Sequence, residues 1–275
     1  MSKILLKINN KDELLYPSDG YILGVKNFCI CFGKTYIPSE IRKIKKKNEG
    51  KKVFASLNRV IFNNELKFYK ETLKKLDDIG LDGIIVGDVA ALSYELTTPI
   101  ILDQLHLNNS SLTIEHYYNN GVNGIILTND ITLKETNDIK ENNKEMLTFK
   151  QVFGLPHLST SKRKLVSNYL KHFNKSSNGR FFKIKENNSD NEYIILEDHF
   201  GTHILNGSPI NLIDRLSNIN ADFFIFDGYL LNDFKWVLDA FMKNNYKLKD
   251  KIDDTFNSNE GFINQKTIYK VKNND

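Results

Sequence analysis

Three segments of the chain share one pattern of hydrophobic and polar positions: an amphipathic helix, a turn and a short apolar run. In the first segment Leu66, Tyr69 and Leu73 recur at helical spacing. The short runs are apolar at successive positions, which indicates strands buried on both faces. These runs are 82–88, 121–127 and 221–228. Repeated helix–turn–strand units predict a parallel β/α architecture.

Five more apolar stretches have the composition of strands. They are 4–8, 21–25 with a continuation to 32, 53–57, 99–102 and 148–153. With the three runs above they give about eight strands, the number in a TIM barrel, and a chain of 275 residues has the length that such barrels need. The sequence therefore predicts an α/β, TIM-like (β/α) barrel, somewhat distorted, over residues 1–246.

Two regions depart from this alternation. Residues 179–186 and 192–197 are extended runs separated by a polar turn, which predicts a β-hairpin inserted near residues 179–197. The polar tail 247–275 contains apolar positions at 261–263 and 267–271. We expect this tail to pack back on the barrel, with a final strand.

Charge and hydropathy leave the partner class open. The chain has 38 basic and 34 acidic residues, and a net charge of +4 neither requires nor excludes nucleic acid. The basic run 42–47 fits a solvated helix face, and a phosphate-contacting patch is the alternative. No apolar run approaches membrane-span length, and the N-terminal pattern is not that of a signal peptide. We expect a cytoplasmic protein without a membrane partner.

The cysteines limit the possible cofactors. Cys29 and Cys31 are the only two, and they alternate within an apolar run that predicts a strand with both sulfurs on one face. Two thiolates cannot complete a four-cysteine zinc or iron–sulfur site. Buried thiols in a reducing compartment are the preferred interpretation, and no metal or cofactor is expected.

Candidate chemistry is sought at the carboxyl ends of the predicted strands, because barrels keep their sites there and no known hydrolase motif is present. The polar residues at these ends are Asn58, Arg59, Asp88, Asp103, Gln104, His106, Asn129, Asp130, His157 and Asp227.

Three of these residues are the candidate catalytic groups. Asp88 and Asp227 could act as general bases, and capping the next helix is the alternative. His106 could be an acid–base group or a ligand, or an ordinary polar loop histidine. Arg59 offers a fork of donors that suits an anion or a carboxylate, and a loop salt bridge is the alternative.

The most distinctive stretch is 149–169. A strand ends at Gly154, a Ser/Thr-rich loop follows, and a helix is expected to open with Lys162 and Arg163. Hydroxyls, free backbone N–H groups and cations suit a phosphate or carboxylate. A capped helix with a basic first turn is the alternative, although cations there oppose the helix dipole. We therefore predict that Arg59, Lys162 and Arg163 bind an anion or RNA.

This stretch resembles the peptidase U32 family, the collagenase-like peptidases. The resemblance lies in a Phe-Gly turn, a Ser-Arg-Arg-like segment and an Asn-Tyr pair in this order: 153–154, 161–163 and 168–169. Further matches in the expected order cover most of the chain: 56–59, 64–66, 82–86, 197–204 and 261–263.

The resemblance implies a TIM-like barrel and two competing activities. One is peptidase activity. The other is oxygen-independent hydroxylation of tRNA or rRNA pyrimidines or of quinone precursors, for which many relatives carry an iron–sulfur cluster on four cysteines. Residues 153–173 contain no cysteine where those relatives place theirs, and the usual Arg-Glu pair is Asn129-Asp130 here. The chain is similar to the short, cysteine-poor members found beside a longer cluster-bearing homologue in low-GC Gram-positive bacteria.

Three hypotheses follow from the resemblance. The first is a cluster-free subunit or partner in hydroxylation of a tRNA uridine, with the longer homologue as its partner and Arg59, Lys162 and Arg163 contacting tRNA or a small anionic ligand. The second is a peptidase that uses Asp88, His106, Asp130 or Asp227. The third is a catalytically degenerate barrel that serves as a binding partner.

Overall fold

Eight parallel strands close into a barrel in the computed structural model, which describes residues 2–187 and 191–265. Neighbouring strands pair in order around the ring, and β1 pairs with both β2 and β14, which closes it. The strands are β1 (Lys3–Lys7), β2 (Gly20–Val25), β4 (Lys52–Leu57), β5 (Gly83–Val86), β6 (Ile100–Leu102), β7 (Gly124–Leu127), β8 (Leu147–Gly154) and β14 (Phe223–Asp227). The predicted TIM-like barrel is confirmed, and each predicted strand overlaps one of these eight.

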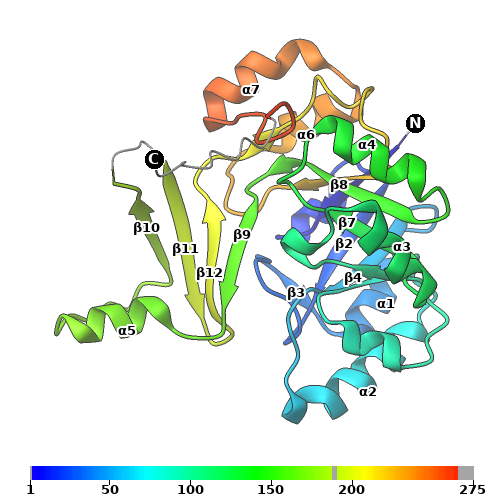
Figure 1. Cartoon of the computed structure of the whole chain (residues 1–275), viewed down its shortest axis with the longest axis horizontal. Helices are drawn as coiled ribbons and strands as arrows, with labels where there is room; N and C mark the ends of the chain where they lie inside the picture. The colour runs from blue at the N-terminus through cyan, green and yellow to red at the C-terminus, as the bar shows by residue number, and fades with distance from the viewer. Residues whose placement is uncertain (1, 188–190, 266–275) are drawn as a thin grey trace, which may run out of the picture.

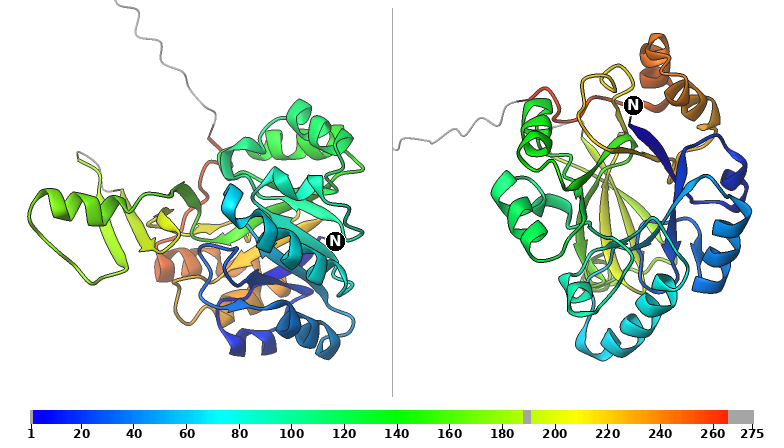
Figure 2. Two further views of the ribbon diagram at one scale, coloured as in Figure 1. Left: turned by 90° about the horizontal axis from the view of Figure 1, so that it is seen from below. Right: turned by 90° about the vertical axis from the view of Figure 1, so that its right-hand side faces the viewer.

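Helices surround the strands (Figure 2, right). They are α1 (Pro38–Lys47), α2 (Leu66–Asp77), α3 (Ser111–Asn119), α4 (Leu133–Asn142), α6 (Lys235–Met242) and α7 (Lys249–Phe256). Between β5 and β6 the chain forms the short 3-10 helix η3 (Val89–Ser93) in place of a full helix. On α2 the predicted apolar positions Tyr69 and Leu73 are buried against the barrel. Burial of this one apolar face holds the helix in place.

Side chains on the inner face of the barrel change from apolar to polar along the strands. An apolar layer fills the middle: Leu5, Ile22, Phe54, Ile85, Ile101, Phe149 and Ile225. Because successive inward positions on a strand are two residues apart, the next inward side chains are Lys7, Ser56, Asp103, Gln151 and Asp227. The barrel interior is therefore filled by apolar side chains in the middle and lined by polar side chains at its carboxyl end.

A second sheet projects from the barrel between β8 and β14 (Figure 1). Its antiparallel strands lie in the order β10 (Phe181–Lys185), β11 (Glu192–Asp198), β12 (Gly201–Asn206) and β9 (His157–Ser161), and α5 (Leu165–His172) precedes β10. We call this unit the insert. The predicted hairpin is confirmed as β10 and β11. The predicted Ser/Thr-rich loop is wrong at β9, because those residues pair with β12, some 40 residues later in the chain.

Two further local predictions are wrong. β2 ends at Val25, so Cys29 and Cys31 lie in a turn region, where Cys31 has a φ of 57°. Both cysteines are buried, as expected. Helix α5 begins at Leu165 and not at Lys162, because Ser161 still pairs with β12.

The C-terminal tail packs on the body over its described part. Helix α7 buries Ile252, and the backbone N–H of Leu133 donates to the carbonyl of Ile263 at 2.7 Å. The predicted strand at 267–271 lies outside the described residues. Within the described ranges, no helix combines the length and apolar character needed to cross a bilayer.

Candidate functional site

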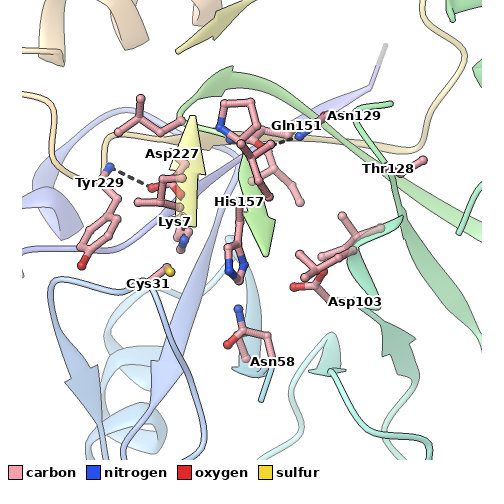
Figure 3. A pocket seen from close by; sticks show the side chains of 18 of the residues that line it. Lys7, Cys31, Asn58, Asp103, Thr128, Asn129, Gln151, His157, Asp227 and Tyr229 are labelled. Carbon is pink, nitrogen blue, oxygen red and sulfur yellow. Dashed lines mark hydrogen bonds and ion pairs between the residues drawn. The ribbon is translucent and has the colours of Figure 1, made fainter. Parts of the chain in front are cut away.

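A cavity of about 110 Å³ opens at the carboxyl end of the barrel, where the insert covers part of it (Figure 3). A buried water needs roughly 10–15 Å³ measured in this way, so several waters or a small organic group fit. Seven of the polar strand-end residues identified in the sequence line it: Asn58, Asp103, His106, Asn129, Asp130, His157 and Asp227. Strand ends that are far apart in the sequence therefore meet in one place, as the barrel requires.

Lys7 and Asp227 form the charged pair on one wall. The Lys7 Nζ lies 2.7 Å from Asp227 Oδ2, and Asp227 Oδ1 accepts from Asn9 Nδ2 at 3.0 Å and from the backbone N–H of Tyr229 at 2.9 Å. Burial opposes the charge on Lys7, but Asp227, Cys31 and Asp103 outweigh it and raise the pKa of Lys7. Lys7 thus stays charged at neutral pH, and Asp227 is anchored by donors to both of its oxygens.

Asp103 is a buried carboxyl group in the same cavity. Burial raises the pKa of Asp103, and Lys7, the Asn58 side chain and the backbone of Leu105 compensate only in part. A carboxyl group with a raised pKa holds its proton more readily than an exposed one, which suits general acid–base chemistry. Figure 3 shows Asp103 and Asn58 facing the ring of His157.

His157 presents an unprotonated nitrogen to this cavity. Its Nε2 lies 3.0 Å from the Ser159 carbonyl oxygen, which can only accept, so Nε2 carries the hydrogen. Burial, aided by nearby His203, lowers the pKa of His157 to about 3. Nδ1 makes no hydrogen bond with any described residue. The ring is therefore a neutral acceptor whose free lone pair can bind a ligand N–H or O–H.

Behind His157 a chain of hydrogen bonds runs into the insert. Thr160 Oγ1 lies 2.9 Å from His157 Nε2 and 3.0 Å from Nδ1 of the fully buried His203. His203 Nε2 lies 3.3 Å from Asp198 Oδ1. The single hydrogen on His157 Nε2 is shared between the Ser159 carbonyl and Thr160 Oγ1, and the Thr160 hydroxyl in turn donates to His203 Nδ1. These contacts fix the orientation of the His157 ring and leave its Nδ1 without a protein partner among the described residues.

His106 sits at the rim and joins two loops. Its Nδ1 contacts Asp130 Oδ2, and its Nε2 lies 2.6 Å from the carbonyl oxygen of Leu158. Both partners accept only, so the ring satisfies both when it is doubly protonated. The Leu158 carbonyl and Asp130 accordingly raise the pKa of His106 against the opposing effect of partial burial.

An amide pair lines the wall near β7 and β8. Asn129 Nδ2 donates to Gln151 Oε1 at 2.8 Å, while Asn129 Oδ1 is buried and has no donor among the described residues. A buried acceptor without a donor costs about 1–3 kcal/mol. A ligand that brought an N–H group to this oxygen would remove that cost.

The predicted anion-binding residues lie at the junction between barrel and insert. All five N–H groups of the buried Arg59 donate within the chain, to Glu65, to Val60 and to the Asn27 carbonyl. Lys162 lies 3.9 Å from the same Glu65. The structure therefore brings Arg59 and Lys162 together around a carboxylate of the chain itself. Arg163 is exposed and has no ion pair with a described residue.

The helix that follows is also closed by the chain's own groups. The first N–H groups of α5 donate to Thr202 Oγ1 at 2.9 Å and to Glu197 at 2.8 Å. Asp88 lies outside the cavity lining, and its two oxygens accept from the backbone N–H groups of Ile61 and Ala90. Of the three candidate catalytic residues, the cavity thus gathers His106 and Asp227.

Sequence reasoning missed several residues of the site. Lys7 and Gln151 could have been found, because each lies two positions after an inward apolar residue on its strand. Thr160 and His203 face each other across β9 and β12, and Asp198 ends β11. No local signal in the sequence predicts that pairing.

The cysteines do not fit a four-thiolate cluster. Burial raises the pKa of both Cys29 and Cys31 to about 12, so both stay protonated thiols at neutral pH. Only Cys31 of the two lines the cavity, and the sequence contains no further cysteine. Among the described residues no group of three or more His, Cys, Asp or Glu side chains is arranged to hold a metal ion.

Comparisons with known proteins give one family. The model of peptidase family U32 matches residues 22–266. A tRNA hydroxylation protein P2 of Bacillus subtilis is 29% identical over 198 residues, which cover 66% of this chain and 63% of that protein. An uncharacterized protease of Methanocaldococcus jannaschii is 24% identical over 261 residues, 88% of this chain and 62% of that protein.

One further relative and one solved structure are also similar to this chain. A tRNA hydroxylation protein P of Helicobacter pylori is 27% identical over 187 residues, 62% of this chain and 43% of that protein. The structure of a U32 peptidase covers 57% of this chain and 70% of its own, at 18% identity and a TM-score of 0.48. The chain thus matches less than two thirds of the length of each of these three curated relatives.

Proposed function

Because the chain belongs to peptidase family U32, we propose that it is a cluster-free component of the oxygen-independent hydroxylation of a tRNA uridine. The observation that carries this proposal is the cavity at the barrel mouth, with an acceptor nitrogen, carboxyl groups and amides around one space. Two of its relatives are named tRNA hydroxylation proteins. A base that undergoes chemistry has to leave its stack and enter such a pocket.

Each side of the cavity has its own part in this proposal. The amides of Asn58, Asn129 and Gln151 read the polar edge of the base. Asp103 accepts or returns a proton, His157 accepts a hydrogen bond from the base, and Thr160 and His203 connect His157 to Asp198. Lys7 supplies positive charge close to the pyrimidine ring of the base. The redox chemistry comes from a partner, for which a longer, cluster-bearing member of the same family is the candidate, because this chain lacks the four thiolates.

Nucleoside analysis tests the proposal. We expect tRNA from a strain that lacks this gene to lose a hydroxylated uridine, measured by liquid chromatography and mass spectrometry. Wild-type protein should restore it, whereas His157→Asn and Asp103→Asn should not, provided that their melting temperatures stay close to wild type. Lys43→Ala, on the exposed face of α1, is the matched control and should restore it fully. An unchanged nucleoside profile in the deletion strain would refute the proposed function.

A peptidase is the second candidate, and one observation favours it. Thr160, His203 and Asp198 stand in the order of nucleophile, base and orienting carboxylate, with an exposed hydroxyl and a buried imidazole. Against this, Thr160 is also bonded to His157, so its oxygen already has two imidazole neighbours. We expect negligible hydrolysis of gelatin or peptides. Turnover that Thr160→Ser retains and Thr160→Val loses would establish the peptidase instead.

A further inference from the structure

The positive charge of the chain is concentrated in one segment. Residues 162–185 contain eight Lys or Arg residues and no Asp or Glu, whereas the whole chain has 38 basic and 34 acidic residues. The remaining 251 residues therefore carry a net charge of −4. A basic segment on an otherwise acidic chain is the electrostatic footprint of a polyanion-binding surface.

This segment forms the end of the insert that lies furthest from the barrel (Figures 1 and 2). It consists of residues 162–164, α5, the connection 173–180 and β10, which together we call the basic lobe. Every residue from Lys171 to Arg180 is exposed. β10 is an edge strand of the second sheet.

Most of the charges on the basic lobe have no partner. Five of them make no ion pair with any described residue: Arg163, Lys164, Lys171, Lys175 and Arg180. Lys162 lies near Glu65, and Lys183 Nζ lies 3.6 Å from Glu192. Glu197 already accepts a hydrogen bond from the first turn of α5, so the N-terminus of this helix is occupied. The positive charge left for a ligand is that of the Lys and Arg side chains.

Aromatic rings lie between these cations. Tyr169 and Phe173 are 64% and 53% exposed, and their ring centroids are 4.9 Å apart at the end of α5. Phe181, on β10, is 49% exposed. Exposed rings interleaved with unpaired Lys and Arg are what a single-stranded nucleic acid needs, because bases stack on the rings and phosphates contact the cations. A solvated charged face would need no exposed aromatic rings.

We propose that the basic lobe binds an unpaired stretch of RNA, with bases stacked on Tyr169 and Phe173 and phosphates held by Lys164, Lys171 and Lys175. The choice of RNA over other polyanions rests on the proposed function. Strand β9 links the two sites, because His157 lines the cavity and Ser161 adjoins the lobe. Five residues of strand span about 16 Å. The near end of the lobe and the barrel mouth thus lie one short strand apart, and an RNA that follows β9 can contact both.

Binding of a fluorescein-labelled RNA hairpin, measured by anisotropy over a range of salt concentrations, tests the cations. Lys164→Ala/Lys171→Ala/Lys175→Ala should weaken binding at least about tenfold and reduce the salt slope by about 2, since each phosphate contact on single strands contributes about 0.7. The matched control is Lys43→Ala/Lys46→Ala/Lys47→Ala, which removes the same charge from exposed positions on α1. It should leave the slope unchanged.

A second pair of variants tests the rings. Tyr169→Ala should weaken hairpin binding about tenfold with an unchanged salt slope, because a stacked base is worth about 1–3 kcal/mol and carries no counterion effect. Tyr118→Ala on α3, where the ring is 46% exposed, is the control and should bind like wild type. A fully paired RNA of the same length should bind more weakly than the hairpin.

Three outcomes would overturn the inference: equal losses in the two lysine triples, equal affinity for hairpin and duplex, or tighter binding to phosphatidylglycerol vesicles than to RNA. The nucleoside analysis is independent of this assay. A deletion strain with unchanged tRNA and a lobe that still prefers the hairpin would refute the proposed function and keep the RNA surface. Altered tRNA in the deletion strain, together with no RNA binding by the lobe, would support the proposed function and refute the RNA surface.

Discussion

His106 is a single ring held between two groups that only accept hydrogen bonds. The Leu158 carbonyl and the Asp130 carboxylate stabilise its doubly protonated form in the folded protein. The pKa of His106 in the folded protein therefore lies above the ordinary histidine value of 6.5. Its stabilising effect is complete below pH 6.5 and is lost as the pH rises through the folded pKa.

The variant His106→Gln should therefore lower the melting temperature more at pH 5.5 than at pH 8.5. Half of the ring is exposed, which keeps the effect small. His116→Gln on α3, whose ring nitrogen contacts only the Asn120 amide, is the control. A His106→Gln deficit that stayed constant with pH would contradict the doubly protonated ring.

The contribution of Lys150 to stability depends on pH in the opposite direction. It is fully buried beside the barrel, its Nζ donates to the Thr128 carbonyl at 2.5 Å, and burial lowers its pKa to about 7 against the attraction of Asp130. Charge on this amine penalises folding below pH 7, and the penalty fades as the pH approaches 10.5. Lys150→Met should therefore raise the free energy of unfolding at pH 6, on the order of 2 kcal/mol after the lost hydrogen bond is counted.

Urea titrations of Lys150→Met at pH 6 and pH 9 measure this difference. The gain should be smaller at pH 9. Thr148→Val, which removes a buried hydroxyl on the same strand, controls for a general change in core polarity and should destabilise at both values. A loss of stability at pH 6 in Lys150→Met would mean that the amine is structurally required.

At the scale of elements, Arg59 fastens the insert to the barrel. Its guanidinium pairs with Glu65 through two bonds of 2.6 and 3.1 Å, and its central carbon lies 4.5 Å from the ring of Phe200, between β11 and β12. Arg59→Met should cost about 3 kcal/mol, because Glu65 then loses its partner, and Arg59→Met/Glu65→Met should recover part of it.

Arg163→Ala is the matched control for that measurement. Its side chain is exposed and unpaired, so we expect a change within about 0.5 kcal/mol in urea denaturation. RNA affinity should show the reverse order, with a loss in Arg163→Ala and little change in Arg59→Met. A stable Arg59→Met protein with weakened RNA binding would instead support the anion-binding role predicted for Arg59 from the sequence.

The elements that the sequence predicts well are those whose signal is local. Each barrel strand is an apolar run next to a turn, and the run at 82–88 alone identifies β5. β9 was missed because its Ser and Thr residues have no apolar pattern and become a strand by pairing with β12. The cavity follows the same division: strand-end residues such as Asp103 were foreseen, while the Thr160–His203 contact depends on a register that no local signal encodes.

At the scale of the whole molecule, the two proposed sites are separated in space. The barrel mouth is a small polar cavity, and the basic lobe is an exposed surface at the other end of β9. The residues outside the insert are nearly neutral, with 30 basic and 29 acidic side chains, and would attract a polyanion weakly. The insert therefore supplies the attraction, and the same strand carries His157 into the cavity. In the proposed function, substrate capture therefore falls to the insert and positioning to the barrel mouth.

The cysteine content of the whole chain predicts that the isolated protein holds no iron–sulfur cluster. A cluster requires four thiolates or an equivalent set, and the sequence offers two cysteines whose burial raises the pKa to about 12. Anaerobic reconstitution, followed by iron and sulfide assays, should give iron far below one atom per chain, while a four-cysteine cluster protein treated in parallel should load fully. Mixing the chain with a cluster-bearing partner should give a complex whose visible absorption belongs to the partner and survives Cys31→Ser in this chain. Stoichiometric iron with a cluster absorption band in the isolated monomer would contradict the prediction and would require ligands other than these two thiols.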